Sequence, residues 1–352
     1  QLQRAKDNVS ENWRVFGNAF IEADLFKDLT FRTQFGVDYT NWYQSAYSYL
    51  NYEDAEPSSS NSLGVNMNYV LNWTWYNTLV YNHTWADKHR LNVLVGTEAI
   101  ENTYRRLYGS SINFFVDDLS YRYIDAGVRQ PSSGSGSSWS MFSLFGKINY
   151  SFNDKYLVDV TIRRDGSSRF GSENRFAVFP AFSLGWRLSS ESFMSGSSWV
   201  DDLKLRFGWG QMGNQNISPD NQFSTYRTDP WRSSYDIGGS NTSTVKGFDT
   251  NRFGNPFGQW ETTTTLNAGI DLTVLNNRLT FNFDWYDRTT TDMLYTLPLP
   301  GTQGDASAPA QNVGEMNNTG VDLNVSWSDA SSSGDFTYNI GFNLSHYKNE
   351  VV

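Results

Sequence analysis

The sequence predicts an all-β protein, a transmembrane antiparallel up-and-down β-barrel. Three observations support this fold class. Apolar and polar residues alternate along many segments, the connections between these segments are alternately short and long, and the polar positions carry many charges. Together these features are typical of barrels that cross an outer membrane with strands.

The alternation is clearest over residues 29–39. Successive side chains of a strand point to opposite faces, so every second residue shares a face. One face is apolar and the other polar, with Leu29, Phe31, Phe35, Val37 and Tyr39 alternating with Thr30, Arg32, Gln34 and Asp38. Residues 15–25 alternate in the same way, and a short turn at 26–28 separates the two segments. This arrangement predicts a β-hairpin.

The same pattern recurs along the chain. Further pairs of alternating segments meet at the short turns 86–89, 153–155 and 276–277 and at the longer links 189–202 and 329–335. The whole sequence therefore predicts about twelve strands in about six hairpins.

The connections between hairpins are much longer than the turns within them. They cover residues 41–65, 104–138, 165–175, 213–258 and 296–312 and are rich in Ser, Gly, Asn, Asp and aromatic residues. Short turns at one end of a sheet and long loops at the other are typical of outer-membrane barrels. Because no domain boundary is evident, residues 1–352 are expected to belong to one transmembrane barrel domain.

The two predicted faces differ in chemistry. The apolar face would meet lipid, where an exposed charge is costly. The other face carries charges of both signs, which suit a watery lumen or a polar plug better than a packed core: Arg32, Asp38, Lys147, Asp159, Arg163, Arg187, Lys204, Arg206, Asp271, Asp284, Arg288 and Asp322. Aromatic residues near the short turns would form an interfacial girdle. Since alternation alone does not separate the two cases, a soluble sheet whose apolar face is its core is the alternative.

Composition excludes several classes of protein. The net charge of −10 argues against a nucleic-acid partner, which needs a basic surface. No apolar run reaches the ~18 residues of a membrane helix, whereas barrel strands need only ~9–11 residues. The absence of cysteine excludes disulfides and thiolate metal sites.

No motif predicts catalysis, a cofactor or a metal site. Residues 208–213 fit the pattern GxGxxG, but a dinucleotide site needs a helix after it, and a loop rich in Ser, Pro and Asp follows instead. The three histidines, His83, His89 and His346, lack zinc-binding spacing. An outer-membrane enzyme would need a cluster of the Ser/His/Asp kind. The chain is therefore expected not to be an enzyme.

Aromatic residues in two predicted loops are the candidates for solute binding. Aromatic faces stack on sugar rings and peptide groups, and nearby Asn and Asp supply hydrogen bonds. The candidates are Trp42, Tyr43 and Tyr47 in the first loop and Tyr226, Trp231 and Tyr235 in the second. The alternative is that these side chains belong to the girdle or pack the loops.

Several separated motifs, in the right order, resemble the SusC/RagA family of TonB-dependent outer-membrane transporters. They lie at 155–157, 162–171, 179–187, 203–206, 210–215, 260–263, 275–279, 312–316, 318–321 and 345–349. The longest is Ile162-Arg163-Arg164-Asp165-Gly166-Ser167-Ser168-Arg169-Phe170-Gly171.

The resemblance implies active import of oligosaccharides or oligopeptides across the bacterial outer membrane. The family's barrel has about 22 strands and an N-terminal plug, so this chain, which shows no plug or TonB box, is expected to be the middle of a longer transporter's barrel. The implied partners are a SusD-like surface lipoprotein that acts as a lid, the TonB complex reached through a region outside this sequence, outer-membrane lipid and the solute. The alternative is a non-energised barrel with a structural or adhesive role.

Overall fold

In a computed structural model of the chain, residues 8–50, 52, 57–228, 233–239, 244–330 and 335–352 are described. Twelve long strands follow one another in one sheet, in chain order. They are β1 (Val9–Phe26), β2 (Leu29–Ser48), β3 (Ser62–Trp85), β4 (His89–Ile112), β6 (Ser133–Phe152), β7 (Tyr156–Ser167), β8 (Phe176–Arg187), β9 (Val200–Asn214), β14 (Glu261–Val274), β15 (Leu279–Thr291), β18 (Met316–Ala330) and β19 (Thr337–Val351). The prediction of an all-β, up-and-down sheet of about twelve strands is confirmed.

The remaining elements are short. β5 (Val128–Arg129) pairs with β4, and three small hairpins are formed by β10 (Thr225–Arg227) with β13 (Asp249–Arg252), β11 (Ser234–Tyr235) with β12 (Val245–Lys246), and β16 (Leu294–Thr296) with β17 (Ala310–Asn312). Five 3-10 turns are η1 (Leu119–Tyr121), η2 (Ile124–Ala126), η3 (Leu188–Ser190), η4 (Ser192–Met194) and η5 (Gly301–Gln303). Within the described ranges, no helix has the length and apolar character needed to cross a membrane.

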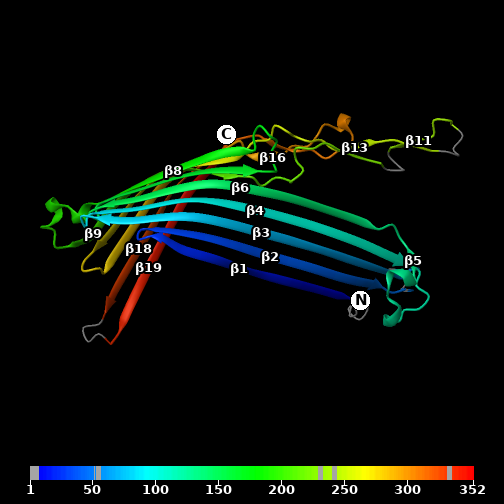
Figure 1. Cartoon of the computed structure of the whole chain (residues 1–352), viewed down its shortest axis with the longest axis horizontal. Helices are drawn as coiled ribbons and strands as arrows, with labels where there is room; N and C mark the ends of the chain where they lie inside the picture. Colours follow the sequence, from blue (N-terminus) through cyan, green and yellow to red (C-terminus); the bar gives the residue numbers. More distant parts are fainter. Residues whose placement is uncertain (1–7, 51, 53–56, 229–232, 240–243, 331–334) are drawn as a thin grey trace. The chain divides into compact units, whose positions relative to one another are not determined.

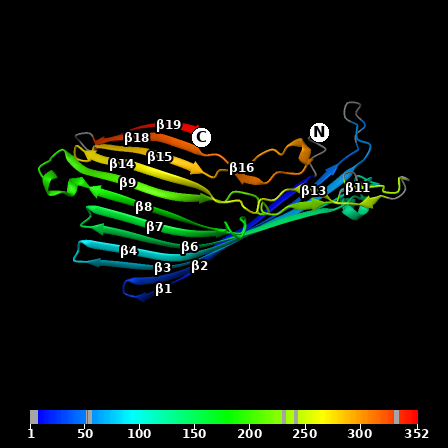
Figure 2. The same cartoon turned by 90° about the horizontal axis from the view of Figure 1, so that it is seen from above.

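The chain divides into two compact units. Unit 1 comprises residues 1–21, 33–76 and 98–141, and unit 2 comprises residues 22–32, 77–97 and 142–352. The long strands β1–β4 and β6 supply residues to both, whereas β7–β9, β14, β15, β18 and β19 belong wholly to unit 2. These unit 2 strands lie side by side and pair antiparallel (Figure 2).

All six predicted hairpins are present. Three of the tight turns place residues in the left-handed region. Ala86 and Asp87 both have φ of 51°, Asn153 and Asp154 both have φ of 54°, and Leu275, Asn276 and Asn277 have φ of 62°, 56° and 62°. Asn and Asp tolerate this conformation better than most side chains, and hairpin turns of the primed types require it. The turn sequences therefore determine where the chain reverses.

Several predicted loops are shorter than expected because the strands are longer. β2 runs to Ser48, β4 runs to Ile112 and β6 begins at Ser133, so parts of the predicted loops 41–65 and 104–138 are strand. Ladder hydrogen bonds join backbone groups, so segments rich in Ser, Gly and Asn can extend a strand that is already paired. In unit 2, η3 and η4 follow one end of β8, and β11, β13 and β16 lie toward its other end (Figure 1).

The register in unit 2 aligns the apolar residues of neighbouring strands. Leu205, Ile270, Phe283, Leu323 and Leu344 stand opposite one another on β9, β14, β15, β18 and β19. This face is uncovered: Ile270 is 38% exposed and Leu344 50% exposed. In the part of the chain that is described, no second layer packs over it, as the core of a soluble sheet would require. The soluble alternative is therefore disfavoured.

Candidate functional site on the polar face of the sheet

Charged side chains gather on the opposite face of β9, β14 and β15. Alternation places Lys204 and Arg206 on the same face of β9. The register sets Lys204 opposite Asp271, and Arg206 opposite Gly269, which in turn faces Asp284 on β15. Pairing of three strands thus brings together charges that are 65 and 78 residues apart in sequence.

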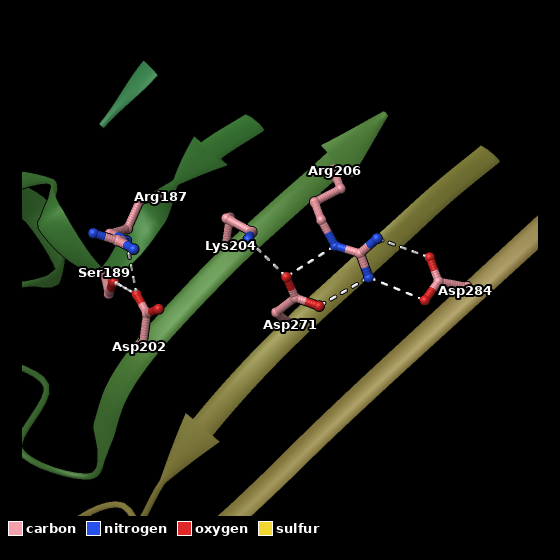
Figure 3. Close-up of polar contacts among 7 residues, drawn as sticks. All are labelled: Arg187, Ser189, Asp202, Lys204, Arg206, Asp271 and Asp284. Atoms are coloured by element: carbon pink, nitrogen blue, oxygen red, sulfur yellow. Dashed lines mark hydrogen bonds and ion pairs between the residues drawn. The ribbon is translucent and has the colours of Figure 1, made fainter. Parts of the chain in front are cut away.

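One guanidinium joins two carboxylates in this cluster (Figure 3). Arg206 donates to Asp271 from Nε and Nη2, both at 2.8 Å, and to Asp284 from Nη1 and Nη2, both at 3.0 Å. Lys204 Nζ lies 3.0 Å from Asp271 Oδ2. Paired donors that meet a carboxylate in this forked geometry form strong, directional contacts. We call Lys204, Arg206, Asp271 and Asp284 the Arg206 cluster.

Gly269 makes the Arg206 cluster possible. A Cβ atom at this position would lie 2.5 Å from Asp284 Oδ1 and 2.8 Å from Arg206 Nη2. Any larger residue would therefore push the guanidinium out of the space between the two carboxylates. The sequence places Gly269 among alternating residues, but only the strand register shows that the side chain of Arg206 passes over this glycine to reach Asp284.

Other charges on this face are also paired. Arg187 Nε lies 3.3 Å from Asp202 Oδ1, which accepts a hydrogen bond from Ser189 Oγ at 2.7 Å (Figure 3). Arg163 donates to Asp165 and to Ser143, each at 2.7 Å. These pairs leave the face polar but nearly neutral locally.

Not every predicted charge has an opposite partner. Within the described ranges, neither Lys147 nor Asp322 has an ion pair. Asp322 stands directly opposite Asp284, which carries the same charge and is itself paired with Arg206. The face therefore offers hydration and hydrogen bonding along its length. In the residues that the structure describes, no group of three His, Cys, Asp or Glu residues could hold a metal ion.

Replacing Arg206 by glutamine is expected to destabilise the folded protein by about 1–3 kcal/mol, because Asp271 and Asp284 lose their charged donor. The lower half of this range is expected, since these side chains are about 30% exposed. Urea unfolding of the full-length protein in liposomes, followed by tryptophan fluorescence, measures the change. Arg278→Gln is the matched control: its ion pair with Asp329 spans 3.4 Å beside a turn. Equal effects of the two substitutions would contradict the special role of Arg206.

The first set of aromatic candidates lies in a strand, not in a loop. Trp42, Tyr43 and Tyr47 all belong to β2, so their predicted loop placement is wrong. Trp42 points to the opposite face from Tyr43 and Tyr47, because successive strand residues alternate. Trp42 is 45% exposed, whereas Tyr47 is only 4% exposed. The structure therefore does not bring these three rings into one site, and their role in solute binding stays a prediction.

Tyr47 packs a small cluster at the loop end of unit 1. Its hydroxyl donates to Asp117 Oδ1 at 2.6 Å, and the Arg122 guanidinium lies 4.2 Å from the centre of its ring. Asn61 donates to the same Asp117 oxygen at 2.8 Å. These contacts hold the connection after β4 against β2.

The second set of candidates lies in the small hairpins of unit 2. Tyr226 is in β10 and Tyr235 is in β11, and each is 67% exposed. Trp231 lies outside the described residues. Solute binding by this set stays a prediction as well.

Sequence reasoning missed a cluster that ties the long loops of unit 2 together. The buried Trp260 ring lies 5.0 Å from Phe170 and 5.6 Å from Phe179, and its Nε1 donates to the carbonyl of Arg175 at 3.2 Å. Gly213 leaves room for Phe179, since a Cβ there would lie 2.0 Å from that ring. Burial also lowers the pKa of the nearby Arg169. We call Phe170, Phe179 and Trp260 the loop core.

An uncovered apolar face backed by an ion-paired polar face defines the wall of a membrane β-barrel. Residues 3–351 match the family described as "TonB dependent receptor-like, beta-barrel", and the chain belongs to this family. The protein is thus a TonB-dependent receptor of the SusC/RagA type in the outer membrane. Members of the family are transporters rather than enzymes.

The individual relatives are similar over a limited part of their length. TonB-dependent receptor P3 of Formosa agariphila is 32% identical over 78% of this chain and 27% of its own length. TonB-dependent receptor SusC of Bacteroides thetaiotaomicron is 36% identical over 65% of this chain and 22% of its own. The solved structure of the RagAB peptide transporter superposes with a TM-score of 0.88 at 28% identity, covering 99% of this chain and 38% of that one. The chain therefore spans between about a fifth and two fifths of these relatives.

Proposed function

We propose that this chain is part of the barrel of an importer that takes up oligosaccharides or oligopeptides with energy supplied through TonB. The observation that supports this proposal is that one face of the sheet is apolar and uncovered, whereas the opposite face is polar and ion-paired. Lipid on the first side and water on the second are the surroundings that these two surfaces favour. A solute would pass along the polar face without any bond being made or broken.

The polar face suits solutes that are rich in hydrogen-bonding groups. The Arg206 cluster and the other ion pairs neutralise most charges of this face locally. The face therefore does not require a charged solute, and a neutral solute can form hydrogen bonds to it in place of water. Sugars and peptides carry many donors and acceptors that such a surface can exchange for water. Similarity to the RagAB peptide transporter supports oligopeptides, and the resemblance to the SusC/RagA family extends the proposal to oligosaccharides.

The edges of the sheet support assembly into a larger barrel. β1 and β19 are the two edge strands, and every residue of both is exposed. An open edge within lipid leaves backbone amides unsatisfied, so a membrane-spanning sheet closes on further strands. We infer that those strands, a plug and a SusD-like surface lipoprotein complete the importer. The similarity to the RagAB transporter, together with the resemblance to the SusC/RagA family, supports the lipoprotein partner.

Uptake by the full-length protein tests this function. The assay measures uptake of fluorescently labelled oligopeptides and oligosaccharides by cells that express the protein. Uptake of at least one class is expected, and it is expected to stop when TonB is deleted. Binding to the cell surface without TonB-dependent uptake of either class would contradict import and favour an adhesive barrel. A deletion of the lipoprotein gene in the same assay tests the lid: uptake is expected to fall strongly.

A further inference from the structure

A polar cavity lies among the loops of unit 2. It has a volume of about 380 Å³ and is lined by residues from three loop segments. Asn216, Ser218 and Thr296 line it with polar side chains, and Ala308 and Ala310 contribute to its apolar part. Arg252 is the one charged residue among those that line it. Specific ligand sites combine a concave surface with a few fixed polar groups in this way.

The walls of the cavity are tied to one another. Asn221 is 3% exposed and makes two hydrogen bonds to Ala310, accepting from its backbone N–H at 2.8 Å and donating to its carbonyl at 3.1 Å. The backbone of Asn255 donates to the carbonyl of Asn221 at 2.7 Å. Residues 251–253 are joined to Ser307 by backbone hydrogen bonds of 2.9 and 3.1 Å. The cavity is therefore a built feature of the paired loops.

Among the described residues, Arg252 is held in place by carbonyl groups. Its Nη2 donates to the carbonyl of Asp220 at 2.6 Å and to that of Phe223 at 3.4 Å. Its Nε is buried and makes no hydrogen bond with the described residues, and no described carboxylate forms an ion pair with the guanidinium.

A nearby arginine shows the contrast. Arg227, on the strand that pairs with the one carrying Arg252, contacts Asp249 at 2.9 Å and Asp305 at 2.7 Å. Asp249, which is close to Arg252 in sequence, is thus engaged elsewhere. Asp220 offers Arg252 its carbonyl oxygen rather than its carboxylate.

We propose that the Arg252 cavity binds a carboxylate group of the imported solute. A guanidinium fixed through Nη2 by two carbonyls keeps Nη1 as a donor for an incoming anion, and a hydrogen bond between a guanidinium and a carboxylate is stronger than one between neutral groups. The volume suits a single terminal residue or sugar ring rather than a whole oligomer. Both a peptide C-terminus and a uronic acid carry the required group. This proposal deepens the import function and rests on it.

Binding of defined probes to the full-length protein, assembled with its surface lipoprotein, tests the site. The probes are N-acetyl-trialanine and its C-terminal amide, and digalacturonate and its methyl ester, measured by isothermal titration calorimetry. At least one acid is expected to bind about 10-fold or more tightly than its neutral partner, since hydrogen bonds between two charged groups are stronger than those to a neutral group. Which acid shows the preference identifies the source of the carboxylate.

Two variants locate the effect. Arg252→Gln is expected to abolish the preference for the acid, and Arg252→Lys to restore part of it. Arg227→Gln removes an arginine that is already paired, and it is expected to keep the preference. Equal binding of acid and neutral probe, no binding of either acid, or an equal loss in the Arg227 variant would overturn the proposal. TonB-dependent uptake of a neutral solute, measured in the same variants, tests import separately, so the two ideas can fail independently.

Discussion

Replacing Val160 by arginine is expected to lower the amount of folded protein in the outer membrane sharply. Val160 lies in β7 on the apolar face, opposite Phe182 of β8, and is 43% exposed. If lipid covers this face, an arginine near the middle of the bilayer costs about 2–4 kcal/mol. Heat-modifiable migration on gels and urea unfolding in liposomes of the full-length protein measure the loss.

The neighbouring position supplies the control. Thr161 follows Val160 in β7 and points to the polar face, where Asp159 and Arg163 already lie. Thr161→Arg is expected to change stability by much less than Val160→Arg. If water rather than lipid met the apolar face, an arginine at the exposed position 160 would be harmless. Equal tolerance of the two substitutions would therefore contradict the membrane assignment.

Replacing Trp260 by alanine is expected to loosen the long loops of unit 2. Trp260 is 6% exposed and contacts both other rings of the loop core. Removal of a buried tryptophan side chain typically costs about 3–5 kcal/mol. Faster hydrogen exchange and new protease cleavage within residues 215–260 are expected, because these residues depend on that packing.

The strands supply an internal reference for the same experiment. Exchange in β14 and β15 is expected to stay slow, since their ladder hydrogen bonds do not involve the loop core. Phe257→Ala is the matched control, because Phe257 is 69% exposed and its truncation opens no cavity. Unchanged protease resistance of the Trp260 variant would show that the loops are held by other contacts.

Much of the sheet could be predicted from the pattern of residue types. Period-two alternation identified the faces of β7, β8, β9, β14 and β15, because side-chain direction in a strand depends only on position parity. The turn at Asn153-Asp154 was also predictable, since few residue types accept the backbone conformation that it needs. Both are local properties.

The ends of the strands could not be predicted in this way. Residues 133–138 consist only of Ser and Gly and have the composition of a loop, yet they begin β6. Their conformation is set by pairing with the neighbouring strand, and backbone hydrogen bonds do not depend on side-chain type. The same cause placed Trp42, Tyr43 and Tyr47 in a strand rather than in the predicted loop.

The sequence by itself determined which side chains face lipid and which face water, and roughly where the chain turns, because strand alternation and turn conformation act over a few residues. Only the tertiary structure decided which charges meet. Arg206 reaches Asp271 and Asp284 across Gly269. Among the described residues, Arg252 has no carboxylate partner, whereas Arg227 has two. These outcomes depend on strand register and on contacts between distant loops, which no local pattern encodes.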